Sequence, residues 1–190
     1  IRPEQLRVFP EDSDLPKDQL NTTIDQHFVP MAAVKPPSPA EFDAWRQRLL
    51  AELRRVTFRH FPDRVPEPRV MGEPSPAELR LAVEPGIEFC LQDASNAQPV
   101  QSAKRIVLIV RGAEDRTRRA EVPSWAVGLI QPGDAVWICD PRGVGETRWT
   151  RRDPPNYVER SCAILGRTAD TGRVWDVAAA ARYVRSRAGG

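Results

Sequence analysis

Histidine, cysteine and long apolar runs are scarce in this 190-residue chain, and each shortage narrows the functions to consider. No apolar run approaches the ~18 residues that a membrane-spanning helix needs, so we expect no membrane span. The three cysteines, Cys90, Cys139 and Cys162, form neither a C-x-x-C pair nor a zinc-ligand spacing. Because no third ligand accompanies the two histidines, His27 and His60, we expect no metal site. Cys90 and Cys139 sit inside apolar runs, which predicts buried structural thiols.

A strong charge of either sign is also missing. Lysine and arginine total 28 against 26 aspartates and glutamates, which leaves a net charge of +2. That value is too small to indicate nucleic acid or a membrane surface as a partner. The length and the 41% hydrophobic content predict one soluble globular domain with a core. The compartment stays open, because an export signal would lie upstream of Ile1.

The first 75 residues are predicted to contain one regular element. Residues 1–37 are rich in proline and acids without periodicity, which indicates an extended connector. Residues 38–75 are predicted to hold an amphipathic helix followed by a proline-rich linker. Ser38, Pro39 and Glu41 supply a capping box and a proline at the first helical position. The apolar stripe of this helix recurs at steps of three and four, at Phe42, Trp45, Leu49, Leu53 and Val56.

Residues 76–190 show the alternation of strands and helices that is typical of an α/β fold. Residues 78–84 and 86–92 alternate apolar with polar or small side chains around an E-P-G turn, which predicts an antiparallel hairpin. Residues 105–110 and 135–139 are continuous apolar runs, as in strands buried on both faces. We expect these two strands to be neighbours in one mixed sheet of a three-layer α/β sandwich.

Two helices are predicted in the same part of the chain. Residues 125–130 favour a short helix with Pro123 near its start. A long loop with two prolines follows residue 149, and a second helix begins near residue 171, capped by Thr171 or Asp170. The residues predicted to share its apolar face are Val174, Val177, Ala178, Ala181 and Val184.

The stretch C-D-P-R-G-V-G-E-T-R-W, residues 139–149, leaves a buried strand abruptly. Glycine tolerates a positive φ, so Gly143 and Gly145 suit a sharp turn there. Asp140 could accept backbone N–H groups of the turn, and Arg142 could reach over the strand ends or pair with an acid. Because ligands bind outside the carboxyl ends of strands in open α/β sheets, the stretch is either a structural turn or part of a site. No phosphate-binding glycine motif is present.

These residues resemble a known family. D-P-R-G-V-G, followed by I-L-G-R-T-A-D-T-G-R-V-W-D, is similar to α/β-hydrolases of the acetyl xylan esterase and prolyl-oligopeptidase-like group. The turn is matched by Asp140, Arg142, Gly143 and Gly145. The later segment is matched by Gly166, Arg167, Arg173, Trp175 and Asp176. The resemblance covers roughly residues 76–188 and implies an incomplete α/β-hydrolase-type sandwich, which the remainder of the hydrolase domain would complete.

The resemblance also implies where catalytic groups belong. A backbone N–H from the loop after residues 105–110 would donate to the oxyanion, which makes Gly112 and Ala113 the candidates, although Gly112 could simply let the chain turn. Trp149 is the candidate substrate-loop residue, whereas Trp45, Trp137 and Trp175 fit core positions. Neither Ser124, Ser161 nor Ser186 stands in a G-x-S-x-G turn, and both histidines precede the sheet, so no catalytic residue is expected in this chain.

Two functions remain open at this point. The first is the N-terminal half of a serine esterase-type hydrolase, inactive alone, whose whole protein would act on a small ester or an acetylated saccharide. The second is a non-catalytic α/β interaction or scaffold module. Neither hypothesis needs a cofactor, and a nucleotide binder is disfavoured because the glycine motifs are missing.

Overall fold

The computed structural model describes residues 2–29, 33–75, 78–95, 99–112, 114–115, 120–149 and 156–188. The chain divides into two units, residues 1–46 and 47–190. The domain boundaries predicted after residues 37 and 75 stay predictions. None of the described helices is long and apolar enough to cross a membrane.

The first unit contains only short helical segments. Two single 3-10 turns, Pro3–Leu6 and Asp12–Asp14, precede α1 (Ile24–Phe28). No described residue of this unit is buried. Large apolar side chains such as Val8 and Phe28 therefore remain exposed, which fits the irregular composition of the segment.

Helix α2 (Phe42–Val56) confirms the helix predicted from the capping box. A 3-10 turn, Pro39–Glu41, precedes the helix, and the backbone N–H of Ser38 donates to Glu41 Oε2 at 3.2 Å. The apolar stripe is nevertheless exposed, with Phe42, Leu49, Leu53 and Val56 between 40% and 50% accessible. Trp45 is only half-buried and packs against Phe42, so the core position expected for Trp45 is wrong.

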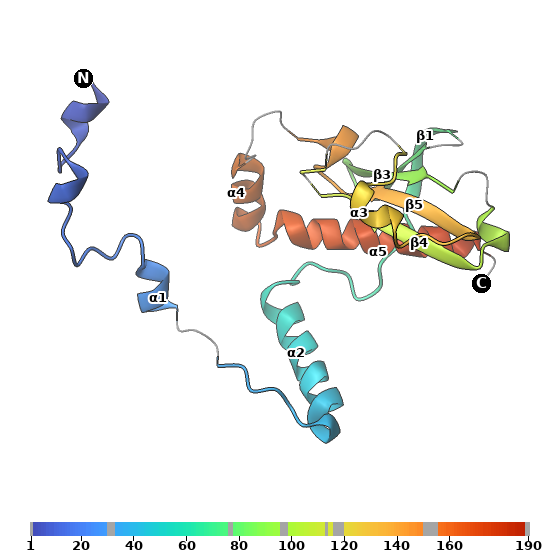
Figure 1. Ribbon diagram of the computed structural model, residues 1–190, viewed down its shortest axis with the longest axis horizontal. Helices are drawn as coiled ribbons and strands as arrows, with labels where there is room; N and C mark the ends of the chain where they lie inside the picture. Colours follow the sequence, from blue (N-terminus) through green and yellow to red (C-terminus); the bar gives the residue numbers. More distant parts are fainter. Residues whose placement is uncertain are drawn as a thin grey trace. The chain divides into compact units, whose positions relative to one another are not determined.

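A five-stranded mixed sheet forms the centre of the second unit (Figure 1). Its order is β1-β2-β3-β5-β4. The strands in chain order are β1 (Arg69–Ser75), β2 (Glu78–Glu84), β3 (Ile87–Asp93), β4 (Arg105–Val110) and β5 (Asp134–Asp140). Of the described strands, only β4 and β5 pair in parallel, with Val107 opposite Val136 and Val110 opposite Cys139. The predicted hairpin is β2–β3, and the two apolar runs are neighbours as expected.

Two of the sequence predictions about strands are wrong. β1 lies in the segment predicted to be a proline-rich linker, where it pairs antiparallel with β2. β4 was expected to be buried on both faces, yet it is the last strand in the order and only Ile109 of its residues is fully buried. Among the described strands, β4 pairs with β5 alone, so the other edge of β4 has no described strand beside it. β5, by contrast, is buried along its whole length.

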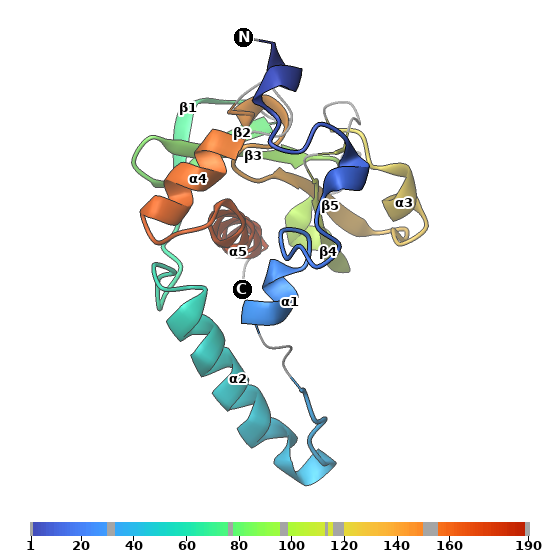
Figure 2. The same cartoon turned by 90° about the vertical axis from the view of Figure 1, so that its left-hand side faces the viewer.

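Helices cover both faces of the sheet. Figures 1 and 2 both show α5 (Ala169–Arg187) running along one face. Trp137 and Cys139 of β5 pack in a cluster with Ala179, Ala180 and Tyr183 of α5. Val136 and Ile138 pack instead with Ala126 of α3 (Ser124–Val127). Because successive strand residues point to opposite faces, α3 and α5 lie on opposite sides of β5.

Helix α5 differs from its prediction in its start and its buried face. Its N-cap is Thr168, with Thr171 completing the capping box, so neither Thr171 nor Asp170 is the cap. Val174 is 46% exposed. The buried residues are Ala169, Gly172, Asp176, Ala179, Ala180, Tyr183 and Val184. The helix therefore turns toward the sheet a face that consists mainly of small residues, together with Asp176, Tyr183 and Val184.

A further helix occupies part of the region predicted to be a long loop. α4 (Asn156–Ile164) follows the two prolines and leads into α5 through a tight connection at Gly166, whose φ is +70°. Residues 150–155, which held the rest of the predicted loop, lie outside the described residues.

Candidate functional site

The carboxyl ends of the parallel strands β4 and β5 open into a groove of about 380 Å³. The backbone N–H of Arg111 donates to the carbonyl of Cys139 at 3.0 Å, which extends the parallel pairing to the strand ends. Gly112 and Pro141 line one side of the groove, and Val174 and Val177 of α5 line the other. The structure thus brings the candidate oxyanion residue Gly112 beside the D-x-R-G-x-G turn. Ala113 lies outside the described residues.

Asp140 is held by an ion pair that the sequence did not indicate. Both of its oxygens accept from Arg111, with Nε and Nη2 each at 2.5 Å, and Gln92 Nε2 adds a bond of 3.3 Å. Asp140 is 1% exposed and Arg111 is 7% exposed. The expectation that Asp140 caps the backbone of its turn is therefore replaced by side-chain pairing, because a buried carboxylate requires a compensating charge. Burial lowers the pKa of Arg111, but the hydrogen bonds and charge of Asp140 outweigh it and raise the pKa.

Arg142 pairs with two acids, as one of the two sequence interpretations anticipated. Its Nε and Nη2 donate to Asp176 at 2.8 and 2.7 Å, and its Nη1 donates to Glu84 at 2.6 Å. Its backbone N–H also donates to Asp176 at 2.8 Å. Glu84 in turn accepts from Arg167 Nη1 at 2.7 Å. This network ties the turn after β5 to the end of β2 and to the first turns of α5.

Burial and pairing compete at each charge of this network. Burial tends to lower the pKa of Arg142, but the hydrogen bonds and charges of Asp176 and Glu84 raise it. Burial tends to raise the pKa of Glu84, yet Arg142 and Arg167 together hold it below the ordinary value of 4.5. For Asp176, burial outweighs the hydrogen bonds from Arg142 and raises the pKa. The network joins two guanidinium groups and two carboxylates.

The two glycines of the turn have the positive φ predicted for them, +74° at Gly143 and +56° at Gly145. Both also allow close contacts. A Cβ on Gly143 would lie 2.8 Å from the indole of Trp149, and a Cβ on Gly145 would overlap Asp140. Trp149 is half-buried and lies 5.7 Å below the guanidinium of Arg173. Trp149, the substrate-loop candidate, thus packs over the turn.

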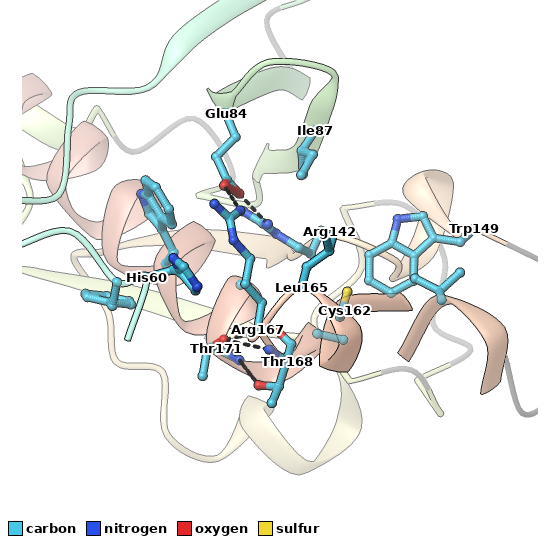
Figure 3. A pocket seen from close by; sticks show the side chains of 15 residues that line it. His60, Glu84, Ile87, Arg142, Trp149, Cys162, Leu165, Arg167, Thr168 and Thr171 are labelled. Carbon is cyan, nitrogen blue, oxygen red and sulfur yellow. Dashed lines mark hydrogen bonds and ion pairs between the residues drawn. The ribbon is translucent and has the colours of Figure 1, made fainter. Parts of the chain in front are cut away.

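A second cavity, of about 220 Å³, lies on another side of α5, between α4, the β2–β3 turn and the segment before β1 (Figure 3). Its walls include the side chains of Phe61, Trp149, Leu165 and Trp175. Figure 3 shows Arg142 and Arg167 converging on Glu84 at this cavity. His60, which had no expected role, also lines it.

The remaining candidates lie apart from the groove. Ser161 donates its hydroxyl to the carbonyl of Tyr157 within α4, and Ser124 begins α3. Cys90 and Cys139 are fully buried, as predicted, and burial raises the pKa of Cys139 well above its ordinary value. Within the part of the chain that the structure describes, no three His, Cys, Asp or Glu side chains are grouped to hold a metal ion.

No partner was predicted from the sequence for Glu84 or for Arg111. Arg111 comes directly after β4, and Asp140 is the last residue of the neighbouring parallel strand β5. Opposite charges at the same end of two adjacent parallel strands predict an ion pair, because those ends lie side by side in the sheet. Glu84 gave no comparable signal, since its partners lie 58 and 83 residues away.

Comparison with known proteins agrees with the fold but reaches no family. No protein-family model and no curated protein matches the chain. Among solved structures, it is similar to that of a "putative acetyl xylan esterase" from Bacteroides fragilis NCTC 9343, with a TM-score of 0.57 and 16% sequence identity. The match covers 83% of this chain and 47% of that one, so the chain spans about half of its neighbour's length. At this identity the similarity shows the α/β fold alone.

Proposed function

We propose that the chain forms the first half of a carboxylic-ester hydrolase of the α/β-hydrolase type and contributes the oxyanion side of its active site. The observation that carries the proposal is the position of Gly112 at the carboxyl end of β4, on the wall of the strand-end groove. A backbone N–H at this point can donate to the negative oxygen that develops when an ester carbonyl is attacked. The fold similarity to a protein named as an esterase supports the same class.

In this proposal the nucleophile and its general base lie outside these 190 residues. The groove is bounded on one side by the edge of β4 that has no partner among the described strands, where Val110 is 38% exposed, and by Val174 of α5. A further parallel strand beside β4 would pair its backbone, cover both valines and bring a nucleophile to the groove. Small acyl esters, including acetylated saccharides, are the proposed substrate class.

The first test is turnover of p-nitrophenyl acetate. The pure 190-residue chain is expected to match the buffer blank, while the polypeptide from the complete reading frame is expected to turn over. Steady turnover by the short chain, at a rate proportional to its concentration, would place the nucleophile inside these residues and contradict the proposal. So would a complete polypeptide without activity.

The oxyanion role is tested with a matched pair at one position. Gly112→Pro removes the backbone N–H, whereas Gly112→Ala keeps it and places a Cβ where no atom lies within 4 Å. In the complete polypeptide, Gly112→Ala is expected to act like the wild type. Loss of about 100-fold or more in kcat is expected for Gly112→Pro or, if the neighbouring N–H is the donor, for Ala113→Pro. Near-normal activity in both proline variants would overturn the assignment.

The alternative, a non-catalytic interaction module, rests on the same edge of β4, which is the last strand of the described sheet. An apolar edge strand offers a row of free backbone groups to another chain. If the chain is such a module, the complete polypeptide would show no esterase activity, and the short chain would bind a partner through β4. Charged substitutions at the exposed Val110 would then abolish that binding.

A further inference from the structure

Among the described residues, four arginines bind a carboxylate side-on, through Nε and Nη2 together. Arg111 binds Asp140 in this way, and Arg142 binds Asp176. In both pairs Nε and Nη2 donate to the two carboxylate oxygens. The same two-pronged geometry recurs where Arg55 binds the exposed Glu52 and where Arg105 binds the buried Asp134. Parallel donation to both oxygens is the strongest arrangement for this pair of groups.

Arg167 lacks this side-on geometry, as do the more exposed Arg54 and Arg80. It donates to Glu84 through Nη1 alone, and its Nε and Nη2 meet no acceptor among the described residues. Glu84 cannot supply the missing side-on partner, because its other oxygen already accepts from Arg142. The Arg167 side chain is 43% exposed and lines the 220 Å³ cavity, so an incoming molecule can reach it.

The rest of the cavity wall fits an apolar body. Trp149, Trp175 and Leu165 contribute large apolar surfaces, and Thr168 and Thr171 are already bonded to each other in the α5 capping box. The cavity thus has apolar walls and one guanidinium group with free donors. Such a cavity suits a ligand that has an apolar body and one negatively charged group. Its volume limits the ligand to a small molecule.

We propose that this cavity binds a small aromatic carboxylic acid. The carboxylate accepts from Nε and Nη2 of Arg167, and the ring packs against Trp149 and Trp175. The site is separate from the strand-end groove, since the two are lined by different residues of α5. The inference goes beyond the proposed ester hydrolysis and does not depend on it.

The test uses phenylacetate and its neutral isostere phenylacetamide. Since two of the five tryptophans line the cavity, intrinsic fluorescence reports binding. Phenylacetate is expected to bind at least about 10-fold more tightly than phenylacetamide, because a bidentate charged pair adds over 1.4 kcal/mol. Arg167→Gln is expected to abolish this preference and leave phenylacetamide binding unchanged. Arg160→Gln, an exposed change on α4 away from the cavity, is the matched control and is expected to bind like the wild type.

A second measurement needs no variant. Cys162 lines the cavity and is partly accessible, whereas Cys90 and Cys139 are buried. Saturating phenylacetate is expected to slow the labelling of Cys162 by a thiol reagent several-fold. Absence of protection, equal affinity for acid and amide, or an unchanged preference in Arg167→Gln would each overturn the proposal. Esterase assays have no part in this test, so its failure is distinguishable from failure of the proposed function.

Discussion

Helix α2 has the clearer apolar pattern in the sequence, whereas helix α5 has the more deeply buried face in the structure. α2 has a clean apolar stripe at helical spacing, and the side chains of that stripe remain 40–50% exposed where they are large and aliphatic. α5 has a buried face made mainly of alanine, glycine and an aspartate, and it packs along the sheet. An amphipathic pattern therefore reports the capacity to pack, while burial requires an opposing surface.

The two helices also differ in how they hold charge. Glu52 and Arg55 on α2 form an exposed ion pair, which contributes little to stability because water screens it. Asp176 on α5 is fully buried and accepts three hydrogen bonds from Arg142. Losing one partner of such a pair leaves a buried charge without compensation. The position of α5 thus depends on electrostatics that α2 lacks.

The largest predicted effect is at Asp176. Asp176→Ala is expected to destabilise the protein by about 3–5 kcal/mol, because the buried guanidinium of Arg142 loses its main partner. The control is Asp170→Ala, which removes an exposed carboxylate paired with Arg173 on the same helix and should cost about 1 kcal/mol or less. Urea unfolding followed by circular dichroism measures both. Equal losses in the free energy of unfolding would show that the buried pair stabilises the protein no more than the exposed pair does.

An intermediate effect separates the two helices directly. Val184 of α5 is 1% exposed and Val56 of α2 is 44% exposed. Val184→Ala should cost about 2 kcal/mol through lost burial and an added cavity, whereas Val56→Ala should cost under about 0.5 kcal/mol. The same unfolding experiment compares them. A large loss at Val56 would mean that the stripe of α2 is covered in solution.

The smallest effect depends on pH. The folded-state pKa of Glu84 lies below its ordinary 4.5, so its ion pairs stabilise the fold above that pH and the contribution fades as the pH falls. Glu84→Gln is therefore expected to lower stability by about 1–2 kcal/mol at pH 7. The difference from the wild type should shrink steadily below pH 4.5. Glu67→Gln, at an exposed residue, should change little at either pH. A pH-independent loss at Glu84 would refute the charge argument.

Local signals predicted several elements correctly. The alternation around E-P-G indicated the β2–β3 hairpin, and the two apolar runs indicated the parallel pair β4–β5. β1 escaped prediction because R-V-M-G-E-P-S contains a glycine and a proline, which weaken any strand pattern. Backbone pairing with β2 outweighs that weakness. The capping box of α2 was predictable because its partners are three residues apart.

The candidate site was predictable in part. Asp140, Arg142, Gly143 and Gly145 were singled out correctly as a turn at a strand end, and the positive φ of both glycines follows from residue type. The partners of the two charged residues were not predictable. Arg111 and Asp176 lie 29 and 34 residues from them in sequence, and Glu84 lies on another strand.

By itself, the sequence determined where most of the strands and helices form and where the chain must turn, because those choices rest on side-chain period, caps and glycine within a few residues. Only the tertiary structure decided which faces are buried and which charges meet. Burial and ion pairing join residues that are distant in the chain, and a buried charge selects whichever opposite charge the packing brings within hydrogen-bonding distance. For this reason Asp176 is buried against Arg142, where α5 packs on the turn after β5. The apolar stripe of α2, although clearer in the sequence, is exposed.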